Sequence, residues 1–107
     1  MMKASNCSAL IDYDSIPKYN YPRLKELYSL NCMPTGTTKN YLAYHKEISK
    51  VNGEELFVLF DPQTSGGLLI SVDPKDKSKT ETILKKYGTI NCIGTVKDRN
   101  EILISLI

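Results

Sequence analysis

Apolar residues along the chain recur with two spacings, one typical of strands and one typical of helices. Alternating apolar and polar side chains predict an extended segment at residues 8–16. Two further strands are predicted at residues 89–96 and 101–107, and the polar residues 97–100 between them are typical of a hairpin turn. We therefore expect the two last strands to be neighbours in one sheet.

Helical spacing is clearest at residues 73–87. Asp73 can cap this helix, Pro74 suits its first position, and Gly88 is expected to end it. A shorter helix is predicted at residues 20–31, because apolar residues recur there three and four positions apart and a proline falls in the first turn.

The middle of the chain is rich in turn-forming residues. Residues 32–40 contain a proline and a glycine among threonines, which is typical of a loop, whereas residues 41–51 are left open, with another short helix as one alternative. The apolar run at residues 56–60 favours a buried strand because it is β-branched and aromatic, although five residues also fit a helical turn. A turn-rich stretch at residues 61–67 precedes a predicted strand at residues 68–72.

Irregular alternation of strands and helices favours an α/β or α+β sandwich in which helices cover one sheet. The 107 residues, with 41% hydrophobic side chains, suit one globular domain. The net charge is only +2 and the two signs are interleaved, which argues against a nucleic-acid partner. No segment approaches the ~20 apolar residues of a membrane span, and the three cysteines lack paired spacing. We expect a cytoplasmic protein with no membrane partner and no metal site.

Two segments combine residue types that can contact phosphate. Residues 61–67 carry a carboxylate, an amide, two hydroxyls and two adjacent glycines. Adjacent glycines permit positive φ angles, and consecutive N–H groups in such a turn can bind an anion; the same composition also fits an ordinary turn. Residues 34–40 place a glycine among threonines before a lysine, but without P-loop spacing, so composition alone favours a local loop.

The chain contains one histidine, His45, and a catalytic triad cannot be recognised from a single histidine without a placed nucleophile and acid. We therefore expect Tyr41, Tyr44 and His45 to be packing or surface residues.

The nine-residue string DPQTSGGLL, residues 61–69, resembles the signature near the end of selenophosphate synthetases, which are also called selenide, water dikinases. PTGTTKN, residues 34–40, is similar to the PGGTxxN loop of that family. Residues 93–96 are similar to its IG-x-V strand, and residues 4–17 to the stretch that follows its TGFGLLGH helix. The matches occur in order over nearly the whole chain.

The resemblance implies a single domain over residues 1–107, similar to the carboxy-terminal domain of selenophosphate synthetase within the aminoimidazole ribonucleotide synthetase-like superfamily. The implied fold is a layered mixed β-sheet with covering helices and partial ferredoxin-like similarity. The family makes selenophosphate, AMP and phosphate from selenide, ATP and water. Its reactive residues and its ATP and Mg²⁺ sites lie mainly in an amino-terminal domain, which this chain is expected to lack together with the first helix of the second domain.

We therefore expect no catalytic residue, no metal ligand and no bound cofactor on the isolated chain, and no activity without the amino-terminal domain. The alternative is a non-enzymatic module that retains the fold and binds phosphate, a nucleotide or a protein. A missing covering helix would expose an apolar face, so the expected partner is the amino-terminal domain or a second copy of the chain.

The resemblance implies a role near substrate or phosphate for residues of both loops. These residues are Asp61, Gln63, Thr64, Ser65, Gly66, Gly67, Gly36, Thr37 and Asn40. Thr35 departs from the family pattern, which has glycine there, and its Cβ would disfavour a positive φ angle.

Overall fold

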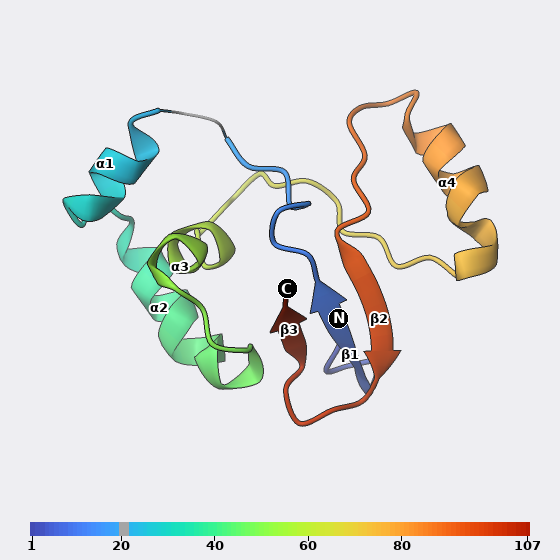
Figure 1. Cartoon of the computed structure of the whole chain (residues 1–107), viewed down its shortest axis with the longest axis horizontal. Coiled ribbons are helices and arrows are strands. Elements are labelled where there is room, and N and C mark those ends of the chain that lie inside the picture. Colours follow the sequence, from blue (N-terminus) through green and yellow to red (C-terminus); the bar gives the residue numbers. More distant parts are fainter. Residues whose placement is uncertain (20–21) are drawn as a thin grey trace.

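A computed structural model describes residues 1–19 and 22–107 of the protein. Its centre is a three-stranded mixed sheet of β1 (Cys7–Ile11), β2 (Gly94–Asp98) and β3 (Ile104–Leu106), in the order β2-β1-β3. β1 pairs with β2 in antiparallel and with β3 in parallel orientation. Helices α1, α2 and α3 lie on one side of the sheet and α4 on the other (Figure 1). The expected α+β class with a mixed sheet is confirmed.

The expected hairpin between the two last strands is wrong, because β1 lies between β2 and β3. The buried hydroxyl of Ser8 accepts a hydrogen bond from the backbone N–H of Asn100 and donates one to the carbonyl of Ile102. The N–H of Ala9 donates to the carbonyl of Leu103. These hydrogen bonds hold the connection between β2 and β3 across the end of β1. The chain therefore crosses from one edge of β1 to the other before β3 begins.

Four α-helices accompany the sheet. They are α1 (Leu24–Ser29), α2 (Thr35–Tyr44), α3 (Gly53–Leu59) and α4 (Lys77–Leu84), with 3-10 turns at His45–Glu47 and Pro74–Asp76. The helix expected at residues 20–31 is confirmed as the shorter α1, although positions 20 and 21 fall outside the described residues. The helix expected at residues 73–87 begins as predicted, with the Asp73 carboxylate accepting from the N–H of Lys75 and Pro74 in the first position.

The loop expected at residues 32–40 is wrong from Thr35 onward, because α2 begins there. Pro34 stands at the N-cap with φ −62° and ψ 141°, and its carbonyl accepts a hydrogen bond from the N–H of Thr37. A proline just before the first turn loses no helical hydrogen bond, since the first N–H groups of a helix have no partner within it. The alternative of a helix within residues 41–51 is partly confirmed, since α2 continues to Tyr44.

The strand favoured at residues 56–60 is also wrong, because this run belongs to α3. Asn52 and Glu55 form a capping box, in which the Asn52 side chain accepts from the N–H of Glu55 and the Glu55 carboxylate accepts from the N–H of Asn52. This reciprocal pair starts a helix just before the apolar run. The helical turn, which five apolar residues also fitted, is the conformation that forms.

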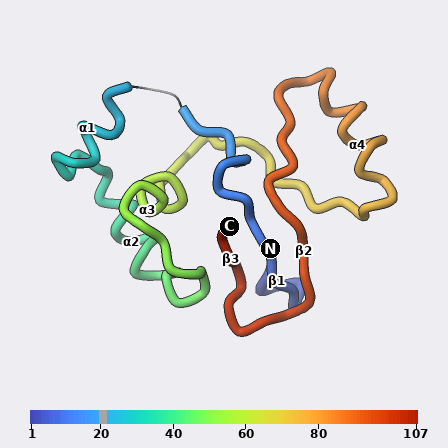
Figure 2. The backbone as a smooth tube through the Cα atoms, in the orientation of Figure 1, coloured from blue at the N-terminus to red at the C-terminus, as the bar shows by residue number. Residues whose placement is uncertain are grey.

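The strand expected at residues 68–72 is absent: these residues are exposed and belong to no helix or strand. They lie in the connection from α3 to α4, which crosses the molecule without joining the sheet (Figure 2).

The core is small. The buried apolar side chains within the described part of the chain are Ala9, Phe60 and Leu103. Gly94 begins β2 where its backbone passes close to β1, and a Cβ there would lie 2.2 Å from the carbonyl oxygen of Leu10. No helix in the described ranges is long and apolar enough to cross a membrane.

Candidate functional site

The two segments proposed from sequence meet at one point of the fold. Gly36, in the first turn of α2, packs against Pro62, which follows α3. A Cβ added to Gly36 would lie 2.8 Å from both the Cβ and the Cγ of Pro62. Real Cβ atoms do not approach other carbons so closely, so this contact requires glycine unless the proline moves. We call this contact and its neighbours, residues 34–40 together with Phe60 and Pro62, the corner.

Asn40 links the same two elements by a hydrogen bond. Its side-chain Nδ2 donates to the carbonyl oxygen of Phe60 at 3.0 Å, in a partly buried environment. Phe60 itself is only 3% exposed and stands at the C-cap of α3. A carbonyl at a helix C-terminus has no partner within the helix, so the amide of Asn40 satisfies a group that would otherwise be hard to solvate here.

Thr37 lies inside the corner. It is 1% exposed, and its Oγ1 has no hydrogen-bond partner among the described residues. Thr35 is the first residue of α2, and the positive φ angles of non-glycine residues in the described ranges are confined to Asn6 and Asn31. The expected conflict between the Cβ of Thr35 and a positive φ angle therefore does not arise.

Residues 61–67 leave the corner and enter solvent, and all of them are exposed. Gln63 Nε2 donates to Asp61 Oδ2 at 3.3 Å, and a Cβ on Gly66 would lie 3.3 Å from Gln63 Oε1. The side chains of Thr64 and Ser65 form no hydrogen bond to any described residue. No glycine in the described ranges has a positive φ angle, so the segment does not adopt the left-handed conformations that its two glycines permit.

The structure therefore separates the nine candidate residues into two groups. Gly36, Thr37 and Asn40 belong to the packed corner. The other six lie on the exposed segment that leaves it: Asp61, Gln63, Thr64, Ser65, Gly66 and Gly67. The exposed group can contact a ligand or a partner, whereas the packed group fixes the point from which the segment starts.

Charge on the exposed segment is negative. Asp61 is its single ionisable residue, and no lysine or arginine occurs between positions 61 and 74. Burial raises the pKa of Tyr28, and the carboxylate of Asp61 raises it further. Tyr28 stacks on Phe57 of α3, with ring centroids 4.3 Å apart. A segment without cations cannot by itself neutralise a polyphosphate.

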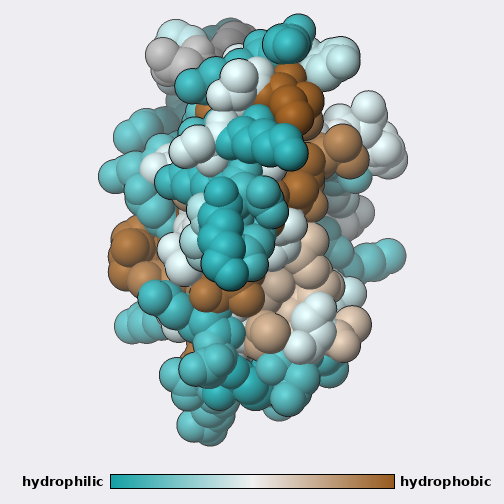
Figure 3. Space-filling view, turned by 90° about the vertical axis from the view of Figure 1, so that its right-hand side faces the viewer, coloured by the Kyte–Doolittle hydropathy of each residue, from teal (hydrophilic) through white to brown (hydrophobic). Residues whose placement is uncertain are grey.

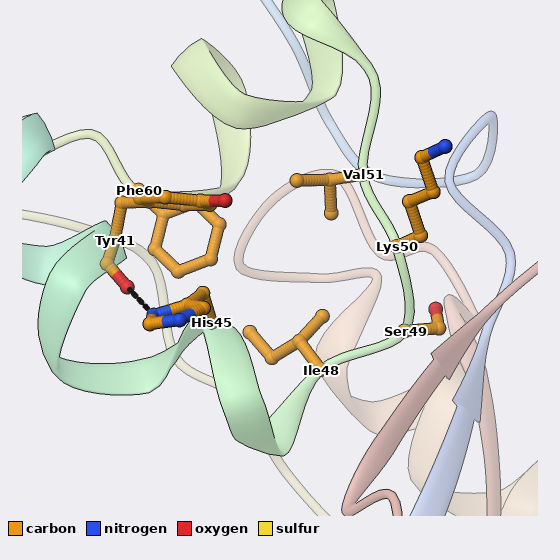
Figure 4. A pocket seen from close by; sticks show the side chains of 7 residues that line it. All are labelled: Tyr41, His45, Ile48, Ser49, Lys50, Val51 and Phe60. Atoms are coloured by element: carbon orange, nitrogen blue, oxygen red, sulfur yellow. Dashed lines mark hydrogen bonds between the residues drawn. The ribbon is translucent and has the colours of Figure 1, made fainter.

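A half-open cavity of about 150 Å³ lies beside the corner (Figure 4). The ring of Tyr41 stacks on His45 with centroids 5.0 Å apart and meets the ring of Phe60 edge-on at 5.5 Å. Ile48 and Val51 point toward these rings from the following turn (Figure 4). His45 Nδ1 is 3.0 Å from the carbonyl oxygen of Tyr41, so the histidine packs within the helix end.

Sequence reasoning missed three features of this region: the cavity, the role of Pro62 and the role of the Phe60 carbonyl. Tyr41 and His45 are four positions apart, a spacing that places two side chains on one helix face, but a helix at residues 41–51 was only one of the alternatives left open by the sequence. Within the described residues, no group of three or more His, Cys, Asp or Glu side chains is placed to hold a metal ion.

Comparison with known proteins bears on the identity of these segments. The family model described as AIR synthase related protein, C-terminal domain, matches residues 1–106. A selenide, water dikinase of Colwellia psychrerythraea is 30% identical over 88 residues, which cover 82% of this chain and 25% of that relative. A selenide, water dikinase of Escherichia coli is 35% identical over 88 residues, which again cover 82% of this chain and 25% of the relative.

A third relative, a selenide, water dikinase of a Shewanella species, is 32% identical over 98 residues, which cover 91% of this chain and 27% of the relative. The resemblance to selenophosphate synthetases that rests on DPQTSGGLL is thus confirmed. The chain spans about a quarter of the length of these curated relatives.

Proposed function

The chain belongs to the family of AIR synthase related protein C-terminal domains, and we propose that it acts as the carboxy-terminal part of a cytoplasmic selenide, water dikinase. In this role it contributes to the formation of selenophosphate, AMP and phosphate from selenide, ATP and water. An amino-terminal domain, on the same polypeptide or on another, carries ATP, Mg²⁺ and the reactive residues. The present chain supplies one wall of the shared site.

The observation that carries this proposal is the meeting of the two family segments in the corner. More than twenty positions separate Gly36 from Pro62, yet they are in contact, and Asn40 bonds to the residue just before Asp61. A family string could persist for unrelated packing reasons. The direct contact between the two family segments supports the view that they form one structural unit. In this unit, α2 sets the direction in which the exposed segment leaves the corner.

The side chains of the exposed segment suit a few hydrogen bonds to one side of a phosphate group rather than a complete phosphate-binding site. Its amide and its two hydroxyls can donate hydrogen bonds to phosphate oxygens, whereas Asp61 repels them. We expect the cations and most of the metal ligands to come from the partner domain, because the segment has no lysine or arginine and Asp61 is its single carboxylate. We therefore expect the isolated chain to show no ATP binding in calorimetry, and micromolar affinity would contradict this division of labour.

A chimera tests the proposal on a working enzyme. The carboxy-terminal quarter of the Escherichia coli relative is replaced by this chain, and AMP formation from ATP is measured with and without selenide. We expect selenide-dependent AMP formation. A chimera that is folded by circular dichroism and binds ATP but forms no AMP would contradict the proposal and favour a non-enzymatic binding module.

A further inference from the structure

The half-open cavity beside the corner has the size and the walls of a site for one aromatic ring. The rings of Tyr41, His45 and Phe60 form one side of it. Ile48 and Val51 face these rings from the following segment (Figure 4). The volume is about 150 Å³, and an engineered cavity of about 150 Å³ in another protein binds benzene. The space therefore suits a single ring rather than a fused ring system.

The walls favour a flat ring over an aliphatic one. Phe60 is 3% exposed, whereas Tyr41 and His45 are only half-buried. The two half-buried rings stack on each other with centroids 5.0 Å apart, and both line the cavity. Aromatic pairs gain energy from stacked or edge-on contact beyond the burial of apolar area. A flat ligand can make such contacts with the parts of these rings that remain open.

Two hydrogen-bonding groups of the lining have no partner among the described residues, the hydroxyl of Tyr41 and Nε2 of His45. His45 Nδ1 is 3.0 Å from the carbonyl oxygen of Tyr41. A carbonyl can only accept, so Nδ1 carries the proton of this bond, and Nε2 of the neutral ring is then an acceptor. The ring of Tyr41 ends in its hydroxyl on the side that faces Val51 (Figure 4). A hydroxyl on a ligand can accept from Tyr41 and donate to His45.

The other polar groups of the lining do not select a charged ligand. Lys50 points away from the rings (Figure 4), and no carboxylate of the described residues lines the cavity. The hydroxyl of Ser49 is already engaged, because it accepts a hydrogen bond from the N–H of Leu106 in β3. The groups that remain for a ligand are uncharged.

We propose that this cavity is a binding site for a small neutral compound with one aromatic ring and one hydroxyl, for which phenol is the simplest probe. The site is independent of the proposed dikinase role, since it uses neither the exposed segment nor any contact with phosphate. Its occupant would rest against α2 and the 48–51 segment, on the side of the corner away from residues 61–67.

Exposed apolar side chains elsewhere are the competing place for an aromatic probe. Figure 3, which views the α4 side of the molecule, shows apolar patches between polar side chains on this face. In the described part of the chain, Leu68 is 92% exposed and Tyr87 84%. Side chains that protrude this far contact a ring on one side only, whereas the cavity has walls on two sides. More apolar area is buried in the cavity, and binding there is favoured.

An NMR titration of the ¹⁵N-labelled full chain locates the site. Phenol should shift the amide signals of Tyr41, His45 and residues 48–51, with a Kd of about 1 mM. Benzene, which lacks the hydroxyl, and cyclohexanol, which lacks the flat ring, should each bind about threefold to tenfold more weakly. Cyclohexanol binding as tightly as phenol, or equally large shifts at Leu68 and Tyr87, would overturn the proposal.

Two matched variants test the assigned contact. Tyr41→Phe removes only the hydroxyl, so it should weaken phenol binding about threefold or more and leave benzene binding unchanged. Tyr44→Phe is the control, because Tyr44 is also on α2 but is 54% exposed and does not line the cavity; it should bind phenol like the native chain. Equal effects of the two variants on phenol would contradict the assignment.

A filled cavity and a competitor complete the test. Val51→Trp should occupy the space, so a chain with native circular dichroism should lose both phenol and benzene binding. Unchanged phenol binding by this folded variant would refute the cavity as the site. AMP should not displace phenol, because its fused base exceeds the space for one ring; displacement by AMP would overturn the proposal of a separate site and leave the dikinase role standing.

Discussion

Replacing Asn40 with aspartate removes one hydrogen-bond donor at the corner and leaves the side chain nearly the same size. Asn40 Nδ2 donates to the carbonyl oxygen of Phe60 at 3.0 Å, and Phe60 is 3% exposed. After the substitution, a carboxylate oxygen faces that carbonyl oxygen. Two acceptors then meet in a partly buried place, and water has little access to separate them.

The loss of stability follows from the burial of this bond. Leaving a buried carbonyl without its donor costs about 1–3 kcal/mol, whereas an exposed hydrogen bond is largely replaced by water. Asparagine and aspartate have similar helix propensities, so no correction for helix formation is needed. We expect Asn40→Asp to lower the free energy of unfolding by about 1–3 kcal/mol at neutral pH. For a domain of ~100 residues, each kcal/mol lowers Tm by about 4–8 °C.

The same variant should depend on pH. Because the nearby carbonyl disfavours the charged form, the pKa of the introduced carboxyl is raised in the folded state. A raised folded-state pKa means that stability is greatest below the unfolded pKa and is lost as pH rises through the folded pKa. Part of the loss from Asn40→Asp should therefore be recovered in acid, where the protonated carboxyl can donate to Phe60 again.

Urea unfolding followed by circular dichroism measures these effects, with Asn91→Asp as the matched control. Asn91 Nδ2 also donates to a backbone carbonyl at 3.0 Å, that of Ser15, but this bond is exposed. We expect the control to lose at most about 0.5 kcal/mol, because water replaces an exposed donor. Equal losses at Asn40 and Asn91 would refute the claim that the corner is a packed junction.

Three further predictions concern packing, capping and ionisation. Gly36→Ala should lower Tm through its clash with Pro62, although alanine is the better helix former by about 1 kcal/mol; in a Pro62→Gly background it should raise Tm instead. Asn52→Ala should lower the free energy of unfolding by about 1 kcal/mol in urea titrations, because a capping side chain is lost. The pKa of Tyr28 should exceed 10.0 in an NMR titration, and in Asp61→Asn it should be lower but still above 10.0, because burial is the larger cause. Since the pKa of Tyr28 is raised in the folded state, the stability that Tyr28 contributes should be lost as pH rises through this folded pKa.

Local signals predicted some elements well. The start of the fourth helical region followed from Asp73 and Pro74, because a capping carboxylate and a proline act within one turn of chain. The capping box of Asn52 and Glu55 was an equally local signal, and it would have corrected the strand expected at residues 56–60. The apolar run alone was ambiguous, since five residues show no clear period.

Contacts between residues that are distant in sequence could not be predicted from local signals. The identities of the candidate residues followed from the strings DPQTSGGLL and PTGTTKN, but the contact of Gly36 with Pro62 depends on where α2 lies relative to α3. The same holds for the sheet order, in which β1 separates the two last strands. Strand propensity at residues 68–72 was present, but propensity forms a strand only where a neighbouring edge is available.

Selenide-dependent AMP formation by the chimera, measured with variants of the corner, tests the central claim most directly. If the corner directs the exposed segment toward a shared dikinase site, Asn40→Asp should reduce the rate of the folded chimera strongly, whereas Asn91→Asp should leave it unchanged. Equal rates for the two variants, or an unmodified chimera without selenide-dependent AMP formation, would contradict the account.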